Sequence, residues 1–238
     1  MPNYYPIYLD LRERDVLVVG GGPIATGKVV GLVEAGARVT VVAPEVSDAI
    51  RRRSEAGEIR WHARQFDDAD IAGMFIVIGA TDDKALNAHV YQLASEQQKV
   101  ANAVDDLDNC NFIAPAIARR GELQVAISTG GASPALAKQI RDRIEQDLLT
   151  EEAAALADFL RSWRPAVKDG LPTYQRRQAY WEGVLESCVP ELLRDGEPVR
   201  AAELMREFLH RAVRPHDADA QCAAHPERAA RCRTCRGV

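Results

Sequence analysis

Hydrophobic residues in the first part of the chain form short continuous runs rather than alternating with polar ones. One run covers residues 16–19, a glycine-rich turn follows, and apolar positions recur at helical spacing over residues 29–33. Ala-Gly-Ala at 35–37 ends this helix before a second run at residues 39–42. Such runs indicate strands buried on both faces, so the pattern predicts a β-α-β unit with parallel strands.

The same alternation of strand and helix continues to about residue 111. It predicts a Rossmann-like α/β domain over residues 1–111, which begins with an apolar segment that lies against the edge of the sheet. The expected elements are an edge segment within 3–14, a helix carrying the arginine triplet 51–53, strands near 59–61, 74–79 and 99–101, and a helix over 86–93.

The pattern changes at residue 112. Two β-like runs surround a turn at Gly121 and predict a hairpin outside the parallel sheet. Ser133 as N-cap and Pro134 at the first helical position predict a helix that completes a region of residues 112–149. Further regions are expected at 150–213, helical with breaks at 164–165, 170–172 and 189–190, and at 214–238, a tail. The pair Tyr180 and Trp181 is better explained by core packing than by ligand binding.

Composition limits the functional classes. The 238 residues are 47% hydrophobic and 27% charged, which is ordinary for a soluble globular protein. A net charge of −5 argues against a general nucleic-acid binder. No apolar run approaches the length of a membrane span, and the five scattered cysteines do not form a secreted disulfide framework. We therefore expect a cytoplasmic protein.

The glycine-rich turn is the candidate cofactor site. Gly20, Gly22 and Ala25 form G-x-G-x-x-A, in which the first glycine permits a tight turn, the second lets a pyrophosphate approach, and the alanine allows close packing of helix on strand. The phosphates would lie at a helix N-terminus. A tight turn without a ligand is the alternative. The residues expected to bind cofactor are Gly20, Gly22, Pro23, Ile24, Ala25, Pro44, Glu45, Thr81, Asp82 and Asn102.

The residues after the second predicted strand bear on the choice between NAD and NADP. Many NAD-binding folds place a carboxylate at the end of the second strand, where this chain has Ala43 and Pro44. Glu45 comes two residues later, and the arginines at 51–53 are expected on a solvated helix face. NAD is the prediction.

Two further positions follow predicted strands, so they would face the crevice at the carboxyl ends of the strands, where ligands bind in an open parallel sheet. Thr81 and Asp82 come after the strand at 74–79, although capping of the next helix is an equally good role for Asp82 or Asp83. Asp105 follows the strand at 99–101 and is the best acid/base candidate, with a turn or cap as the alternative.

Five motifs together resemble the precorrin-2 dehydrogenase module of siroheme synthases. They lie in that family's order and spacing across about residues 5–150, with a weaker helical match to about 210: VGGG at 19–22, ATDD at 80–83, NAVD at 102–105, FIAPAI at 112–117 and STGGASP at 128–134. No uroporphyrinogen methyltransferase domain follows in this sequence, which favours the stand-alone form.

The resemblance implies NAD-dependent oxidation of precorrin-2 to sirohydrochlorin by a homodimer, with the hairpin and the following helix in the subunit contact. It places the family's essential aspartate at Asp105. Some members also insert Fe2+, so a bifunctional dehydrogenase and ferrochelatase is one alternative, and a non-catalytic nucleotide- or metal-sensing protein is another. The substrate carries eight carboxylates, for which the candidate contacts are Thr129, Ser133, Lys138, Arg141, Arg176 and Arg177.

The tail departs from this resemblance. Cys222, His225, Cys232 and Cys235 form C-x2-H-x6-C-x2-C, two ligand pairs suited to zinc or an iron–sulfur centre. The surrounding sequence is rich in alanine and arginine and has no apolar run to fold on the metal, so a disordered tail is the alternative.

Overall fold

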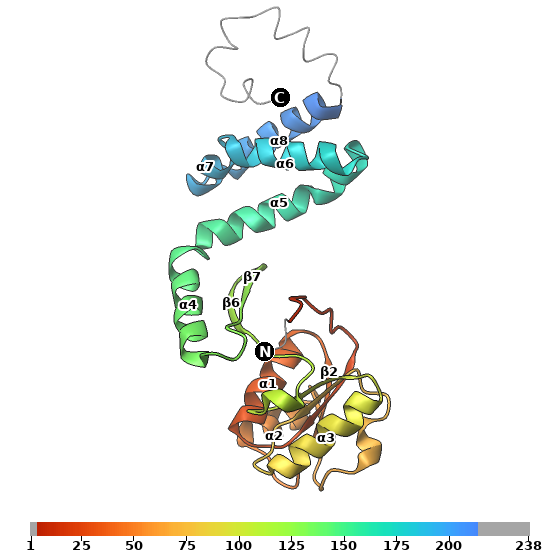
Figure 1. Cartoon of the computed structure of the whole chain (residues 1–238). Helices are drawn as coiled ribbons and strands as arrows, with labels where there is room; N and C mark the ends of the chain where they lie inside the picture. The colour runs from red at the N-terminus through yellow and green to blue at the C-terminus, as the bar shows by residue number, and fades with distance from the viewer. Residues whose placement is uncertain (1–3, 214–238) are drawn as a thin grey trace, which may run out of the picture. The chain divides into compact units, whose positions relative to one another are not determined.

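The computed structural model describes residues 4–213, which form two compact units (Figure 1). The N-terminal unit comprises the chain up to residue 115 together with residues 129–133. Among the described residues, the C-terminal unit comprises 116–128 and 134–213.

The N-terminal unit is built on a five-stranded parallel sheet with the strand order β3-β2-β1-β4-β5. This confirms the predicted Rossmann-like α/β class. Its strands are β1 (Asp15–Val19), β2 (Arg38–Val42), β3 (Arg60–His62), β4 (Ile76–Gly79) and β5 (Val100–Ala103). Its helices are α1 (Pro23–Glu34), α2 (Asp48–Glu55) and α3 (Lys84–Glu96), with short 3-10 turns η1 (Asp68–Ile71) and η2 (Leu107–Asn109).

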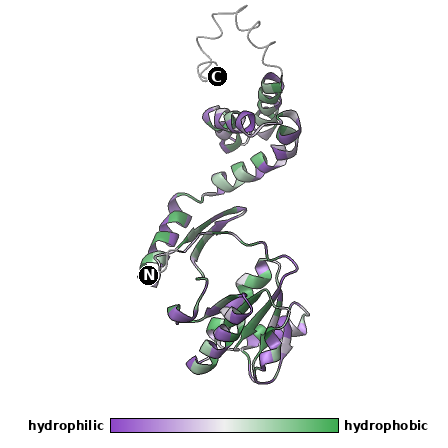
Figure 2. Ribbon diagram, turned by 45° about the vertical axis from the view of Figure 1, so that its right-hand side comes forward, coloured by the Kyte–Doolittle hydropathy of each residue, from purple (hydrophilic) through white to green (hydrophobic). Residues whose placement is uncertain are grey.

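Both faces of the sheet are buried, as the continuous hydrophobic runs predict. Val16 and Val18 of β1 pack into a core on the face covered by α1 and α2. Leu17 and Val19 point to the opposite face and pack into a second core with α3 and η1. Figure 2 shows hydrophobic residues along the strands and polar residues on the outer sides of the helices.

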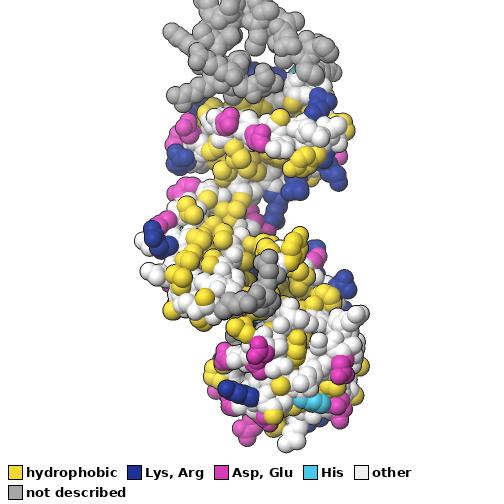
Figure 3. All heavy atoms as spheres, viewed as in Figure 1, with side chains coloured by type: hydrophobic (Ala, Val, Ile, Leu, Met, Phe, Trp, Pro, Cys, Tyr) yellow, Lys and Arg dark blue, Asp and Glu magenta, His cyan; other side chains and the backbone are white. Residues whose placement is uncertain are grey.

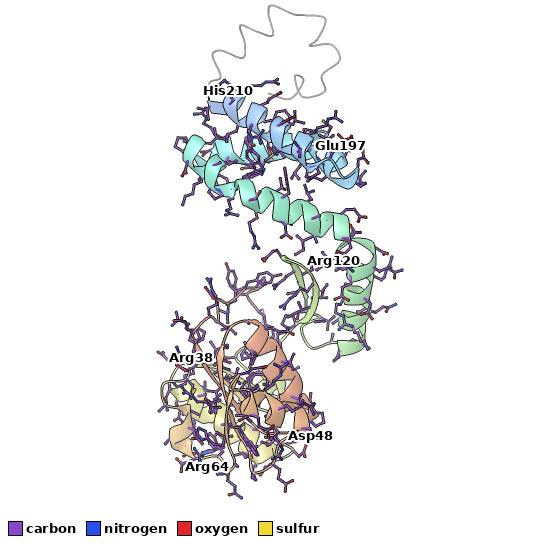
Figure 4. All side chains as sticks on the ribbon, turned by 180° about the vertical axis from the view of Figure 1, so that it is seen from behind. Arg38, Asp48, Arg64, Arg120, Glu197 and His210 are labelled. Atoms are coloured by element: carbon purple, nitrogen blue, oxygen red, sulfur yellow. The ribbon has the colours of Figure 1, made fainter. Side chains whose placement is uncertain are left out.

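The strand order reverses direction between β1 and β4, and this position defines where a ligand can enter an open parallel sheet. The carboxyl ends of the strands lie at the end of the sheet that Asp48 and Arg64 mark in Figure 4, opposite Arg38. At that end the Ala80 amide donates to the Val19 carbonyl at 2.7 Å, so the loops after β1 and β4 begin side by side.

The C-terminal unit begins with the predicted hairpin. Strands β6 (Ala116–Arg120) and β7 (Leu123–Ile127) pair antiparallel in a sheet of their own, and Gly121 turns the chain with a φ of 52°. Helix α4 (Pro134–Asp147) packs against this hairpin and leaves hydrophobic side chains exposed, which Figure 3 shows as a yellow surface.

Four further helices complete the C-terminal unit: α5 (Glu151–Gly170), α6 (Tyr174–Glu186), α7 (Val189–Arg194) and α8 (Pro198–Val213). Their core contains Tyr180 with Trp181 packed against it, which confirms the packing role expected for this pair. In the described part of the chain, no helix combines the length and the hydrophobicity needed to cross a bilayer.

Two sequence expectations are wrong. Helix α5 does not break at Pro165 but runs through it, because Trp163 and Val167 on either side pack in the core and outweigh the hydrogen bond that proline removes. Residues 4–10 do not lie against the sheet as the expected edge segment: Tyr5 and Ile7 are 86% and 60% exposed, and in this part of the chain only Leu11 reaches the core.

Candidate active site

A cleft of about 640 Å³ lies at the carboxyl ends of the strands, within the range typical of small-molecule sites. Six of the expected cofactor-binding residues line it: Gly20, Gly22, Pro44, Glu45, Thr81 and Asp82. Pro23, Ile24, Ala25 and Asn102 are not among its lining residues.

Gly20 occupies a position that only glycine can fill. Its φ is +123°, a conformation that residues with a side chain rarely adopt, and a Cβ there would stand 2.2 Å from the Ala80 carbonyl oxygen. The Gly20 amide donates to the Val42 carbonyl at 3.0 Å. The first turn is therefore fixed between the ends of β2 and β4.

Gly21 is also sterically required, although the G-x-G-x-x-A pattern leaves its position open. A Cβ at Gly21 would stand 2.1 Å from the Glu45 carbonyl oxygen. The Ser47 amide donates to the Gly21 carbonyl at 2.9 Å, and the hydroxyls of Ser47 and Thr26 are 2.7 Å apart. These contacts hold the glycine turn against the loop that presents Glu45 to the cleft.

Gly22 is the N-cap of α1 and has open space around it. No atom lies within 4 Å of the position that a Cβ would take, and no side chain caps the helix. Pro23 sits at the start of the helix, and Ala25 is fully buried beneath it, which is the close packing expected of that residue. The unblocked end of α1 suits an anionic group such as a pyrophosphate.

The opposite wall of the cleft is fixed by Asn87, which is only 3% exposed. Its Oδ1 accepts from the Thr81 amide at 3.1 Å and from the Thr81 hydroxyl at 2.8 Å, and its Nδ2 donates to the Thr81 carbonyl at 2.9 Å. Asp83 caps α3 by accepting from the amides of Ala85 and Leu86, which settles the capping question in its favour. Asp82 and Asp83 both line the cleft, and the side chain of Asp83 is the one engaged in capping.

Sequence reasoning missed three residues that line the cleft, two of them apolar. Gln65 and Phe66 follow β3, and Leu86 lies in the first turn of α3, and all three line the cavity. The rule that ligands bind beyond the carboxyl ends of strands could have predicted the positions of the two residues after β3. It could not be applied because β3 is too short for its last residue to be recognised in the sequence.

Asp105 lies in the turn after β5, beside β4, with its side chain exposed. Its φ is 60°, in the left-handed region that aspartate adopts more readily than most residues. It does not line the 640 Å³ cleft itself but follows the next strand of the sheet.

Lys28 of α1 is a charged neighbour of Asp105 that the sequence did not reveal. Ala25 and Val29 of the same helix share a core with Val104, so this face of α1 lies against the Asp105 loop. Burial lowers the pKa of the Lys28 ammonium, while the Asp105 carboxylate and Cys110 act in the opposite direction. A half-buried cation therefore accompanies the candidate base.

The turn at residues 129–133 belongs to the same unit and lies against the Asp105 loop. A Cβ at Gly131 would stand 2.6 Å from Leu107 Cδ1, two residues beyond Asp105. The Thr129 hydroxyl accepts from the Ser133 amide at 3.1 Å and donates to the Ser133 carbonyl at 3.2 Å. The structure thus brings Thr129 and Ser133 to the neighbourhood of the candidate base.

The other candidate cations belong to the C-terminal unit, and three of them have partners there. Arg141 pairs with Asp142, Arg176 donates to the Ala212 carbonyl, and Arg177 donates to the carbonyls of Leu171 and Pro172. Lys138 is exposed on α4 and forms no ion pair with a described residue. Arg176 and Arg177 therefore have clear structural roles in joining α6 to its neighbours.

The candidate metal ligands Cys222, His225, Cys232 and Cys235 lie outside the described residues. Within residues 4–213, no group of three or more His, Cys, Asp or Glu side chains is arranged to hold a metal ion.

Comparison with known proteins agrees with this architecture. A family described as "Putative NAD(P)-binding" matches residues 7–116, one described as "Sirohaem biosynthesis protein central" matches 120–147, and one described as "Sirohaem synthase dimerisation region" matches 152–209. The solved structure of SirC, a precorrin-2 dehydrogenase, superposes with a TM-score of 0.65 and 30% identity, covering 88% of this chain and 98% of SirC. The chain belongs to the siroheme synthase and precorrin-2 dehydrogenase family.

Curated members of the siroheme synthase and precorrin-2 dehydrogenase family are longer than the region they share with this chain. The siroheme synthase of Actinobacillus pleuropneumoniae serotype 3 (strain JL03) is 38% identical over 205 residues, which are 86% of this chain and 42% of that protein. Siroheme synthase 1 of Pectobacterium atrosepticum is 39% identical over 209 residues, 87% of this chain and 43% of that protein. The chain thus spans about two-fifths of these relatives.

The match to the dimerisation region supports a homodimeric assembly for members of the family. That match covers α5 to α8, whereas the resemblance in the sequence assigned the subunit contact to the hairpin and α4. The exposed hydrophobic side chains of this region are Leu136 and Ile140 of α4 and Leu148, which follows the helix.

Proposed function

We propose that this chain oxidises precorrin-2 to sirohydrochlorin with NAD as the hydride acceptor. The observation that carries the proposal is the position of Asp105, at the carboxyl end of β5 next to the switch-point cleft. The chain that holds it matches a precorrin-2 dehydrogenase over 88% of its own length and 98% of the length of that enzyme. The protein would act in the cytoplasm as a homodimer, and its substrate would be a tetrapyrrole.

The residues of the cleft fit a dinucleotide. Open space and an uncapped helix end at Gly22 would receive the pyrophosphate, and Phe66 with Leu86 supplies an apolar wall for a base. Glu45 is the carboxylate in the cleft nearest along the chain to the end of β2, and we assign it to the ribose hydroxyls. A carboxylate there would repel a 2′-phosphate, which favours NAD over NADP.

The chemistry requires removal of a hydride and a proton from the reduced macrocycle. Bound NAD would supply the hydride acceptor. Asp105 accepts the proton, since an exposed carboxylate in a turn can approach a substrate carbon as a general base. Lys28 provides a positive charge beside it, which would attract the carboxylates of the substrate.

Thr129 and Ser133 are our candidates for hydroxyl contacts with the substrate, because their turn packs beside the Asp105 loop. Lys138 and Arg141 on α4 are the further candidate cations, of which Lys138 is without an ion-pair partner among the described residues. Arg176 and Arg177 are weaker candidates because their guanidinium groups already bind main-chain carbonyls.

The test is anaerobic conversion of precorrin-2, followed by its absorbance spectrum, with NAD and in parallel with NADP. The decisive variant is Asp105→Asn, because asparagine also tolerates the left-handed conformation and removes only the base. We expect turnover to fall about 10²- to 10⁴-fold, with NAD binding retained.

Asp108→Asn is the matched control, since Asp108 is an exposed aspartate in the adjoining 3-10 turn. It should convert precorrin-2 at the rate of the unchanged protein. Equal turnover in Asp105→Asn would remove Asp105 from the mechanism, and no conversion by the unchanged protein with either nucleotide would overturn the proposed activity.

A further inference from the structure

The loop that carries Asp105 is closed by a thiol. The chain leaves β5 at Ala103, turns, and comes back so that Cys110 forms an antiparallel bridge with Asn102. The Cys110 Sγ lies 3.2 Å from the Ala103 carbonyl oxygen and 2.9 Å from the Asp106 carbonyl oxygen. These two carbonyls flank the segment that contains Asp105, so a single side chain spans the base of the turn.

The thiol is itself held in place. Asn102 donates its Nδ2 to Cys110 Sγ at 3.1 Å and to the Phe112 carbonyl at 3.0 Å. Burial raises the pKa of the Cys110 thiol, so at neutral pH it carries the proton needed to donate to a carbonyl. Asn102 is also one of the residues predicted to bind cofactor, and its Nδ2 takes part in this arrangement.

The turn needs such support because of its backbone. Asp105 has a φ of 60°, and a residue other than glycine held in this region costs of order 1 kcal/mol. An exposed turn with this cost would relax toward other conformations unless neighbouring contacts fixed it. The turn is also closed by main-chain bonds, from the Asp106 amide to the Ala103 carbonyl at 3.3 Å and from the Asn109 amide to the Asp106 carbonyl at 3.2 Å. The side-chain amide of Asn109 adds a bond to the Asp106 carboxylate at 2.7 Å.

We propose that Cys110 is a positioning residue, which orients Asp105 through the carbonyls of Ala103 and Asp106. This inference rests on the proposed function, in which Asp105 is the base. It gives the cysteine a role that is neither nucleophilic nor metal-binding: the thiol does not touch substrate and acts only through the turn.

The test compares Cys110→Ala, which removes the donor, with Cys110→Ser, which keeps one. We expect kcat for precorrin-2 oxidation to fall about tenfold or more in Cys110→Ala, since small misplacements of a catalytic group are costly, and to recover in part in Cys110→Ser. The KM for NAD should stay unchanged in both. Cys188→Ala, at an exposed cysteine of the C-terminal unit, is the matched control and should behave like the unchanged protein.

A double variant separates positioning from a general loss of structure. In the Asp105→Asn background, measured by single turnover, adding Cys110→Ala should slow the reaction no further, because the group it orients is gone. A further tenfold loss in the double variant, or an unchanged kcat in Cys110→Ala, would overturn the inference. If the alanine variant does not fold, Cys110→Val fills the site without a donor and serves the same comparison.

The outcomes also distinguish this inference from the proposed function. Full activity in Asp105→Asn would reject the base itself. Lost activity in Asp105→Asn together with normal kcat in Cys110→Ala would reject only the role of the thiol.

Discussion

Replacing two glycines of the same turn by alanine should produce opposite defects. At Gly22, φ is −77° and no atom lies within 4 Å of a new Cβ. Alanine is a poorer N-cap than glycine by up to about 1 kcal/mol, but it also restricts the unfolded chain by about 0.4–1 kcal/mol. Gly22→Ala should therefore unfold within about 3 °C of the unchanged protein.

The cost of Gly22→Ala should appear in cofactor binding. The added methyl group occupies the open space over the helix end, where the proposed pyrophosphate would lie. We expect the Kd for NAD to rise at least about tenfold, equivalent to about 1.4 kcal/mol.

Gly20→Ala should instead damage the fold. Its φ of +123° costs alanine about 1–2 kcal/mol, and a Cβ 2.2 Å from the Ala80 carbonyl adds about 1–3 kcal/mol of overpacking. The expected loss is about 2–5 kcal/mol, or a decrease in Tm of about 5–15 °C.

Thermal unfolding followed by circular dichroism and titration calorimetry with NAD measure the two effects. Normal NAD affinity in Gly22→Ala would show that the pyrophosphate does not lie over this glycine. A Tm for Gly20→Ala equal to that of Gly22→Ala would refute the steric argument.

Two other residues give predictions that depend on charge and pH. Lys28→Met should lower turnover about tenfold, because it removes the positive charge beside Asp105. The Tm at pH 7 should stay the same or rise, because burial disfavours the charged ammonium. Unchanged turnover would exclude an electrostatic role for Lys28. Burial raises the pKa of Tyr180 to about 12, so the folded state retains the proton that the unfolded chain loses near pH 10, and stability should fall as pH rises between these values. Tyr180→Phe removes the hydrogen bond to the Met205 carbonyl and should lower the free energy of unfolding by about 1 kcal/mol at pH 7. The variant should also lack the loss of stability that Tyr180 causes at alkaline pH. Denaturant unfolding at pH 7, 10 and 12 measures both effects.

The sequence predicted the sheet well because its signals are local. The run at 16–19 is apolar at every position since both faces of β1 are covered, and Gly20 is required by a contact between adjacent turns. Pro165 misled the prediction because a local rule against proline in helices was outweighed by packing of residues distant in sequence.

The candidate site was predicted less completely, for a related reason. Lys28 looks like any polar position of an amphipathic helix, and only the packing of α1 beside the Asp105 loop gives it significance. Asn87 lies in the second turn of a helix, with nothing in its neighbourhood along the chain to show that it binds both ends of one residue, Thr81. Such roles arise from tertiary contacts and have no spacing by which to recognise them.

The path of the chain between the two units limits how this protein can be divided. Because residues 129–133 return to the N-terminal unit after the hairpin has left it, a fragment ending at residue 115 would lack the turn that covers Leu107. No single cut in the sequence separates the two units, because the N-terminal unit is made of two separate stretches of the chain. Truncated genes, proteolytic fragments and fusion proteins have to take this into account. A version of the N-terminal unit made alone would need the hairpin replaced by a short linker, so that residues 115 and 129 remain joined.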